Sequence, residues 1–409
     1  MASITPFKAL RPQADKAAFV ASRPYDVLNS AEARYEVQGN PYSFLHITKA
    51  EIDLPETIDI HSVKVYEKAK ENLQRFISEK VLFREDQPCY YIYRLIMNGR
   101  SQTGLVCGSS VDDYENDTIK KHEFTRPEKE QDRIQHISIS GAQTGNVFLA
   151  YRTNTGIDNL IESWKSNNTP LYDFTAEDGI QHTVWVVNDD NVIEAITQIF
   201  LEEVAETYIA DGHHRAASAA KVRLALGDKA TTNASYFLTT LFPANQLHIM
   251  DYNRLVKDLN NLNKESFLNS IRENFIVTEE GAAYAPAELH AIGMYLDGQW
   301  YKLRAKDGTY TSDPIGVLDV TILQELILSP ILGIKDQRTD KRIDFVGGIR
   351  GLGELEKRVD IGEMKVAFSL YPVSIDQLFS IADSGNVMPP KSTWFEPKLR
   401  DGLLTHLID

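Results

Sequence analysis

Cysteine is scarce in this 409-residue chain, which carries only Cys89 and Cys107. The two flank Asn98-Gly99, the strongest short signal for a hairpin turn, and a two-residue turn there pairs Cys89 with Gly108. A one-residue offset sends the two sulfurs to opposite faces of the ribbon, so a disulfide between them is disfavoured. The sequence therefore predicts two buried, reduced thiols, as in a protein kept in the cytoplasm.

Long apolar runs and an excess of basic residues are also absent. No stretch approaches the roughly 18 uncharged apolar residues of a membrane helix, and the start MASITPFKAL lacks the basic and apolar regions of a signal peptide. With 43 basic and 58 acidic side chains the net charge is -15, which argues against nucleic acid as a partner. We therefore expect a cytoplasmic protein without membrane or nucleic-acid partners, in which a local basic pocket can still hold a small anionic metabolite. The oligomeric state is not indicated.

The composition is that of an ordinary globular protein, with 43% hydrophobic and 25% charged residues, and the length predicts two or three domains. Residues 181–243 alternate between strand and helix patterns most clearly. The expected elements are strands at 43–47, 183–187, 207–210 and 235–241, and helices within 62–80, from Pro127, over 190–204 and from His213. This pattern predicts a mixed α/β (α+β) fold.

The sharpest local motif is Asp211-Gly212-His213-His214-Arg215, where an apolar strand ends and a small-residue helix begins. Backbone N–H groups at a helix N-terminus lack partners within the helix and attract anions, and Gly212 lets the backbone approach a phosphate closely. Arg215, expected in an exposed first turn, can add a bidentate contact. Asp211 can hold Mg²⁺ or take a proton from an attacking hydroxyl group.

A structural role for this motif is the alternative, because an isolated Asp-Gly is ordinarily only a helix cap. One aspartate, two histidines and one arginine in five consecutive positions exceed what a cap requires, which favours a functional site. Zinc is disfavoured, because adjacent histidines point apart on a helix and no further ligands stand at zinc spacing.

The same motif resembles the phosphate-binding signature of the ParB/sulfiredoxin superfamily, and in particular that of its free serine kinases. Over nearly its whole length the chain also resembles the bacterial domain-of-unknown-function family 1015. The segments that carry this second resemblance are Ile4–Phe7, Arg23–Val27, Asn40–Tyr42, His122–Glu123 with Thr125, Tyr252–Arg254 and Met388–Lys398.

These resemblances imply a ParB/sulfiredoxin-like phosphate-binding core at 156–255 between an N-terminal α/β region, 1–155, and a C-terminal one, 256–409. They imply a phosphoryl-transfer enzyme acting on a small phosphorylated metabolite, with O-phosphoserine or serine as the best candidate. A phosphatase and a nucleotide-dependent serine kinase both fit, with Mg²⁺ and ADP or ATP as possible cofactors. The alternative is a ParB-like nucleotide-binding regulatory module without turnover.

A second charged segment runs from His122 to Arg133. If a helix starts at Pro127, Lys129 and Arg133 share one face and Arg126 lies at its start, so the three cations can bind a carboxylate and a phosphate together. A solvated helix with internal ion pairs is the alternative. The resemblance to the serine kinases implies a catalytic glutamate before the phosphate loop, and Glu123 is the candidate for it.

A third segment, Lys391-Ser392-Thr393, follows two prolines and can hold a phosphate through one ammonium and two hydroxyl groups, although a plain turn explains the prolines equally well. A substrate with a phosphate and a carboxylate carries more negative charge than one arginine and one helix dipole balance. We therefore predict that 122–133 and 391–393 converge on the Asp211–Arg215 loop.

Overall fold

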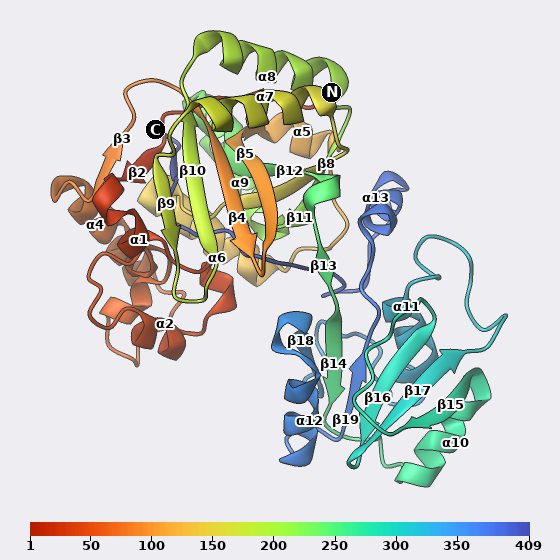
Figure 1. Ribbon diagram of the computed structural model, residues 1–409. Coiled ribbons are helices and arrows are strands. Elements are labelled where there is room, and N and C mark those ends of the chain that lie inside the picture. Colours follow the sequence, from red (N-terminus) through yellow and green to blue (C-terminus); the bar gives the residue numbers. More distant parts are fainter. The chain divides into compact units, whose positions relative to one another are not determined.

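Strands and helices alternate throughout the computed structural model, which describes residues 1–409 and divides into two units (Figure 1). Unit 1 comprises Met1–Lys121, Thr125–Leu247 and Pro397–Asp409, and unit 2 comprises His122–Phe124 and His248–Glu396. The mixed α/β class expected from the sequence is confirmed. No helix is both long and apolar enough to cross a membrane.

Unit 1 is built on a nine-stranded mixed sheet. Its order is β6-β11-β8-β12-β5-β4-β10-β9, with β1 added beside β5. The pairs β6/β11 and β8/β12 are parallel and the other pairs are antiparallel. The strands are β1 (Ile4–Thr5), β4 (Tyr90–Met97), β5 (Arg100–Ser110), β6 (Ile119–Lys120), β8 (Val147–Tyr151), β9 (Tyr172–Thr175), β10 (Gln181–Val187), β11 (Thr207–Asp211) and β12 (Tyr236–Pro243).

Two short ribbons and nine helices complete unit 1. The ribbons pair β2 (Leu10–Pro12) with β3 (Leu82–Arg84), and β7 (Ala142–Gln143) with β21 (His406–Leu407). The helices are α1 (Ala17–Val20), α2 (Ser30–Glu36), α3 (Leu45–Thr48), α4 (Val63–Ser78), α5 (Val111–Glu115), α6 (Pro127–Ser140), α7 (Thr155–Asn167), α8 (Asp190–Glu203) and α9 (His213–Leu226). Short 3-10 turns are η1 (Ala14–Lys16), η2 (Tyr25–Val27), η3 (Ala50–Asp53), η4 (Gly227–Lys229), η5 (Asn233–Ser235) and η6 (Ala244–Gln246).

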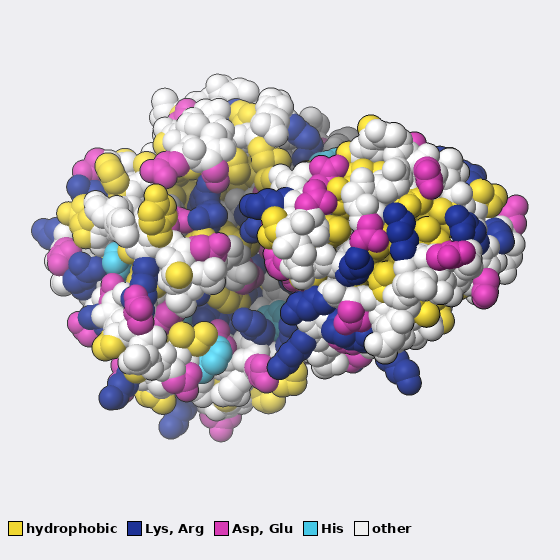
Figure 2. Space-filling view, turned by 90° about the horizontal axis from the view of Figure 1, so that it is seen from below, with side chains coloured by type: hydrophobic (Ala, Val, Ile, Leu, Met, Phe, Trp, Pro, Cys, Tyr) yellow, Lys and Arg dark blue, Asp and Glu magenta, His cyan; other side chains and the backbone are white.

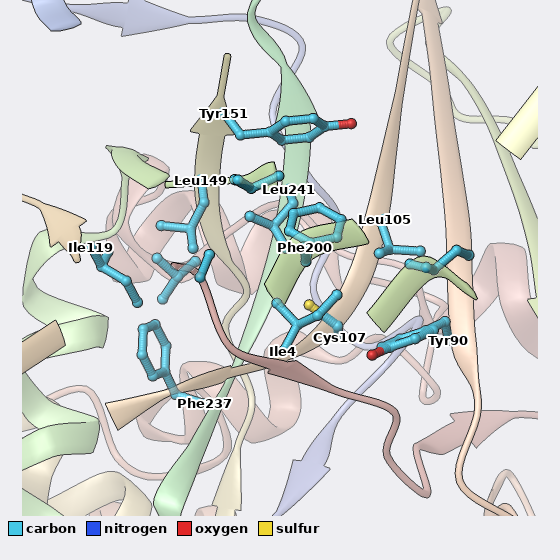
Figure 3. Close-up of a cluster of buried hydrophobic side chains, with 14 of the residues drawn as sticks. Ile4, Tyr90, Leu105, Cys107, Ile119, Leu149, Tyr151, Phe200, Phe237 and Leu241 are labelled. Carbon is cyan, nitrogen blue, oxygen red and sulfur yellow. The ribbon is translucent and has the colours of Figure 1, made fainter. Parts of the chain in front are cut away.

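The main core of unit 1 lies on this sheet. Side chains of β5, β8 and β12 meet those of α7 and α8 in one buried cluster, in which Phe200 packs edge-on against Tyr151 with ring centroids 5.3 Å apart (Figure 3). Cys107 is buried in the same cluster, and Cys89 is also buried, with both thiols reduced as expected. Burial of such apolar area is the main force that holds the helices on the sheet.

Unit 2 has a six-stranded antiparallel sheet in the order β15-β17-β16-β19-β14-β18. Its strands are β14 (Tyr252–Val256), β15 (Phe275–Glu280), β16 (Ala291–Leu296), β17 (Gln299–Ala305), β18 (Ile343–Gly347) and β19 (Val366–Ser369), and β13 (Ile249–Met250) pairs separately with β20 (Trp394–Phe395). Its helices are α10 (Lys264–Asn274), α11 (Asp319–Leu323), the π-helical turn η7 (Gln324–Leu328), the 3-10 turn η8 (Gly348–Arg350), α12 (Leu352–Asp360) and α13 (Ile375–Asp383).

Most of the expected elements near the motif are present. The helix from Pro127, the strand before Asp211 and the helix from His213 are α6, β11 and α9. The strand expected at 43–47 is wrong, because Leu45–Thr48 forms the buried helix α3. The expected boundary at residue 155 falls within unit 1, because β8 before it pairs with β12 after it in one sheet. The expected boundary at 255 falls inside β14 of unit 2.

Candidate functional site

The Asp211–Arg215 motif forms the turn between β11 and α9. Asp211 ends the strand, Gly212 is the N-cap at φ 104°, and His213 starts the helix. A Cβ on Gly212 would lie 3.2 Å from Cζ of Arg215 and 3.4 Å from Cα of Val147. The turn therefore needs glycine both for its backbone conformation and for this close approach.

The N-termini of α6 and α9 lie side by side. The backbone N–H of Arg126, the N-cap of α6, donates to Nε2 of His214 at 2.8 Å, and the Ser218 hydroxyl donates to the carbonyl of Glu130 at 3.1 Å. Both pairs are 88 residues apart in the sequence, so the two helices run in the same direction. Each helix N-terminus carries about half a positive charge and several unpaired N–H groups, and two of them together favour an anion more than one does.

Arg215 is buried, not exposed as the sequence analysis expected. Only 8% of the residue is accessible, because Asp26, Asn146 and Asp211 surround its guanidinium and residues of α6 line the cavity beside it. Its guanidinium lies 3.3 Å from Oδ2 of Asp211 and 3.5 Å from Oδ2 of Asp26, and Nη1 donates to the carbonyl of Asn146. Burial alone would lower the pKa of Arg215, but the two carboxylates outweigh it and the pKa is raised.

Asp211 is held by two cations. Its Oδ2 lies 3.3 Å from Nη2 of Arg215 and 3.3 Å from Nζ of Lys398. The structure contains no group of three or more histidine, cysteine, aspartate or glutamate side chains that could hold a metal ion. Two cations on one carboxylate oxygen also repel a divalent ion. These residues do not fit a protein-bound Mg²⁺, and Asp211 is better described as the anion of an ion-pair cluster.

A small cavity of about 20 Å³ lies beside Arg215, lined by Tyr25, Arg133, His136 and Gly145 among others. Cζ of Arg133 is 3.9 Å from the ring centroid of Tyr25, and Asp132 balances its charge at 2.7 Å. Burial lowers the pKa of His136 to about 4, so this imidazole is neutral at physiological pH. The volume accommodates about one water molecule. This cavity is therefore too small to hold a metabolite.

Of the cations predicted in 126–133, the structure brings two close to the loop. Arg126 touches His214 through its backbone, and Arg133 lines the cavity together with Arg215. Lys129 is exposed in the first turn of α6, and His213 is buried in the first turn of α9. On the face of the molecule in Figure 2, lysine and arginine side chains are interspersed with aspartate and glutamate, without a single large patch of one sign.

The remaining predicted residues belong to unit 2. Glu123 lies in the short segment His122–Phe124, where the carbonyl of His122 accepts a hydrogen bond from the N–H of Met388 at 3.0 Å. The Ser392 hydroxyl donates to the carbonyl of Pro389 at 2.6 Å, and Nζ of Lys391 lies 5.7 Å from the ring centroid of Tyr252. The convergence of Glu123, Lys391, Ser392 and Thr393 with the Asp211–Arg215 loop stays a prediction.

Four residues near Arg215 were missed by the reasoning from sequence. Tyr25 and Asp26 stand in the Arg23–Val27 segment and Lys398 ends the Met388–Lys398 segment, so the resemblance to a family singled out their neighbourhoods but not their roles. The fourth, Asp401, had no signal of its own. It is 2% exposed, and burial raises its pKa to about 7 against the opposing effect of Arg215.

Several solved structures are similar to part of the chain at low identity. A conserved hypothetical protein from Pyrococcus furiosus is 15% identical, over 74% of this chain and 95% of that chain, with a TM-score of 0.37. A free serine kinase in complex with AMP is 12% identical, over 74% and 91%, with a TM-score of 0.39. C-terminally truncated SbnI from Staphylococcus aureus is 12% identical, over 74% and 87%, with a TM-score of 0.41.

A search among curated proteins found no match. The family model described as protein of unknown function (DUF1015) matches residues 4–321, which include the strand β11, the Asp211–Arg215 loop and the helices α6 and α9. This match extends over more than half of the sequence, and the chain therefore belongs to the DUF1015 family.

Proposed function

We propose that this protein binds a small phosphate-bearing metabolite at the joined N-termini of α6 and α9 and moves its phosphoryl group. O-phosphoserine or serine is the best candidate substrate, and ADP or ATP the candidate second ligand, as the likeness of the loop to the ParB/sulfiredoxin superfamily implies. The observation that supports the proposal is the parallel packing of the two helices, fixed by the contacts Arg126–His214 and Ser218–Glu130.

Charge is the physical reason for placing the anion there. Phosphoryl transfer requires positioning and neutralisation of charge more than covalent help from the protein. Two helix N-termini contribute about one positive charge between them, and Arg126 and Lys129 stand at the start of α6. In a chain with a net charge of -15, such a local concentration of positive potential is an attractive site for a doubly charged anion.

The buried residues then have supporting roles. Arg215 and Lys398 fix the carboxylate of Asp211 at the edge of the loop, where it stays ionised and can orient an attacking hydroxyl group by accepting its hydrogen bond. His213 and His214 in the first turn of α9 are candidates for acid–base chemistry. Glu123, Lys391, Ser392 and Thr393 remain candidates as well, and conservative variants of each would test them.

The experiment that tests this function incubates the full chain and Mg²⁺ with O-phosphoserine, with and without ADP, and measures serine, phosphate and ATP. Phosphate released without ADP identifies a phosphatase. Serine and ATP formed only with ADP identify a kinase running in reverse. If neither product forms and inorganic phosphate does not bind, the proposed site is refuted.

A pair of lysine variants makes the test specific to the helix N-termini. Lys129 and Lys64 are both exposed in the first turn of a helix, Lys129 in α6 and Lys64 in α4. Lys129→Ala should weaken phosphate binding by about twofold to fivefold, the size expected for one exposed charge near an anion. Lys64→Ala should leave it unchanged. Equal effects of both variants would place the anion elsewhere.

A second candidate is a nucleotide-binding regulatory module without turnover. The observation that favours it is the mutual pairing of Arg215, Lys398, Asp211 and Asp26, which leaves the charged groups of the loop engaged with one another. The same assay separates the two functions, because such a module binds ADP or ATP and forms neither serine nor phosphate.

A further inference from the structure

The last segment of the chain, Pro397–Asp409, lies inside unit 1. Ser22 and Asp401 exchange backbone hydrogen bonds of 3.1 and 2.9 Å, and Leu10 and Thr405 exchange two of 2.9 Å. Gly402, at φ 90°, passes so close to Phe44 that a Cβ would lie 2.6 Å from its side chain. The position of Asp401 is therefore fixed by its backbone on both sides.

Arg400 fixes the same segment through its side chain. Its Nε lies 3.3 Å from Nε2 of His182, its Nη2 donates to Asp178, and its backbone N–H lies 3.3 Å from the Tyr93 hydroxyl. Burial lowers the pKa of His182 to about 3, so the imidazole is neutral and its Nε2 can accept from the guanidinium. The next side chain, Asp401, lies near Arg215, whose charge acts on its carboxyl.

Asp401 faces a cluster of charges that already pair with one another. The groups around its carboxyl are Arg215 of α9, Arg133 of α6, and Asp26 with the backbone of Tyr25 from η2. The carboxylates of Asp26, Asp132 and Asp211 already pair with Arg133, Arg215 and Lys398, three acids for three cations. Oδ2 of Asp401 is buried without a hydrogen-bond partner, and the two cations that act on it, Arg215 and Arg133, also pair with other carboxylates.

Other acids of the cluster are less suited to hold a proton. The side chain of Asp26 is 39% exposed, and that of Asp211 is 31% exposed and lies between two cations. Solvent and opposite charges both favour the ionised carboxylate. Asp401, fully enclosed and next to Asp26, is the member of the cluster whose charge changes most readily.

We propose that Asp401 takes up a proton when an anion occupies the N-termini of α6 and α9, so that anion binding at this site is coupled to pH. This inference rests on the proposed anion site. A second negative charge near Arg215 makes the ionised form of Asp401 less favourable, and by linkage protonation of Asp401 strengthens anion binding by the same factor. Anion affinity should therefore fall as the pH rises through about 7, the pKa of Asp401.

The test measures protons taken up on binding. Sulfate is the probe, because it stays doubly charged across the whole pH range of the experiment. Calorimetric titration of the full chain with sulfate at pH 7, in two buffers of different ionisation enthalpy, gives the number of protons bound. The unmodified protein should take up a fraction of a proton, at most about one half, because Asp401 is about half protonated at this pH before sulfate binds. Asp401→Asn should take up less than the unmodified protein by this amount.

Asp319 provides a matched control. It is also 2% exposed with one unpartnered carboxyl oxygen, and burial raises its pKa to about 7, but it belongs to unit 2. Asp319→Asn should bind sulfate with the same proton uptake as the unmodified protein. Equal uptake in the unmodified protein and in Asp401→Asn would overturn the inference while leaving the anion site standing. Absence of sulfate binding would overturn both.

A second measurement needs no variant. The C=O stretch of a protonated carboxyl group absorbs apart from that of a carboxylate, so infrared difference spectra report the event directly. Addition of sulfate at pH 7 should increase the protonated-carboxyl band, which histidines cannot produce. No increase with bound sulfate would refute the role of Asp401, even if the Asp401→Asn variant does not fold.

Discussion

Replacing Arg215 by alanine should destabilise unit 1 strongly. The guanidinium, itself 8% exposed, lies within 3.5 Å of both Asp26 and Asp211 and donates to the carbonyl of Asn146. Removing one partner of a fully buried ion pair costs about 3–5 kcal/mol. Because Asp26 and Asp211 are partly solvated and Asp211 keeps Lys398, we expect a loss at the lower end of this range. A domain is stable by only about 5–15 kcal/mol in total, so this loss is a large part of the whole.

Urea denaturation followed by tryptophan fluorescence measures the effect, since Trp164 and Trp185 both lie in unit 1. Arg223→Ala is the control on the same helix, because Arg223 pairs with Asp112 near the surface and such pairs contribute about 0–1 kcal/mol. Arg215→Lys keeps the charge but not the fork that reaches Asp211 and Asn146 together, and should fall between the two. A loss in Arg215→Ala no larger than in Arg223→Ala would refute the ion-pair cluster as described.

Three further changes have clear expected outcomes. Asp401→Asn should reduce the loss of stability between pH 4 and pH 7. The pKa of Asp401 is raised to about 7 in the folded state, so the folded protein binds this proton more tightly than the unfolded protein. The stability from this proton is fully present below the ordinary pKa near 3.8 and is lost as the pH rises through 7. Denaturation midpoints that fall equally steeply in both proteins would contradict this. Gly212→Ala should lower the thermal denaturation midpoint more than Gly179→Ala. Both glycines have a positive φ, but only at Gly212 would a Cβ lie against Arg215. The reverse order would disprove the close packing. Gly347→Ala should destabilise unit 2, because its Cβ would lie 2.6 Å from the Trp394 ring. Gly353→Ala in α12 should instead stabilise it by up to about 1 kcal/mol, because alanine favours the helix and its Cβ meets nothing within 4 Å. A tolerated Gly347→Ala would count against the Trp394 contact.

Local patterns in the sequence were sufficient for much of unit 1. The apolar spacing after Ser62 predicts α4, and Pro127 marks the start of α6. The hairpin signal at Asn98-Gly99 predicts the observed register, in which Met97 pairs with Arg100. These features depend on neighbours within one helix or one hairpin, which is why the sequence alone predicts them.

Features that depend on distant contacts were not predictable in the same way. A run such as Ser43–Ile47 is too short for periodicity to separate a strand from the buried helix α3. Arg215 is buried by groups far from it in the sequence, among them Asp26 and the backbone of Asn146. Asp401 joins the cluster through backbone bonds to Ser22. No local pattern around Asp401 carries that information.

The path of the chain between the units has a consequence for its synthesis. The ribosome makes residues 248–396 of unit 2 before the segment Pro397–Asp409 that completes unit 1. At roughly 5–20 residues per second, this interval lasts on the order of ten to thirty seconds. During it the nascent unit 1 carries Asp211 without Lys398, and Arg215 without Asp401. The newborn protein thus acquires its complete ion-pair cluster only once Pro397–Asp409 has been made, after the strands and helices of unit 2.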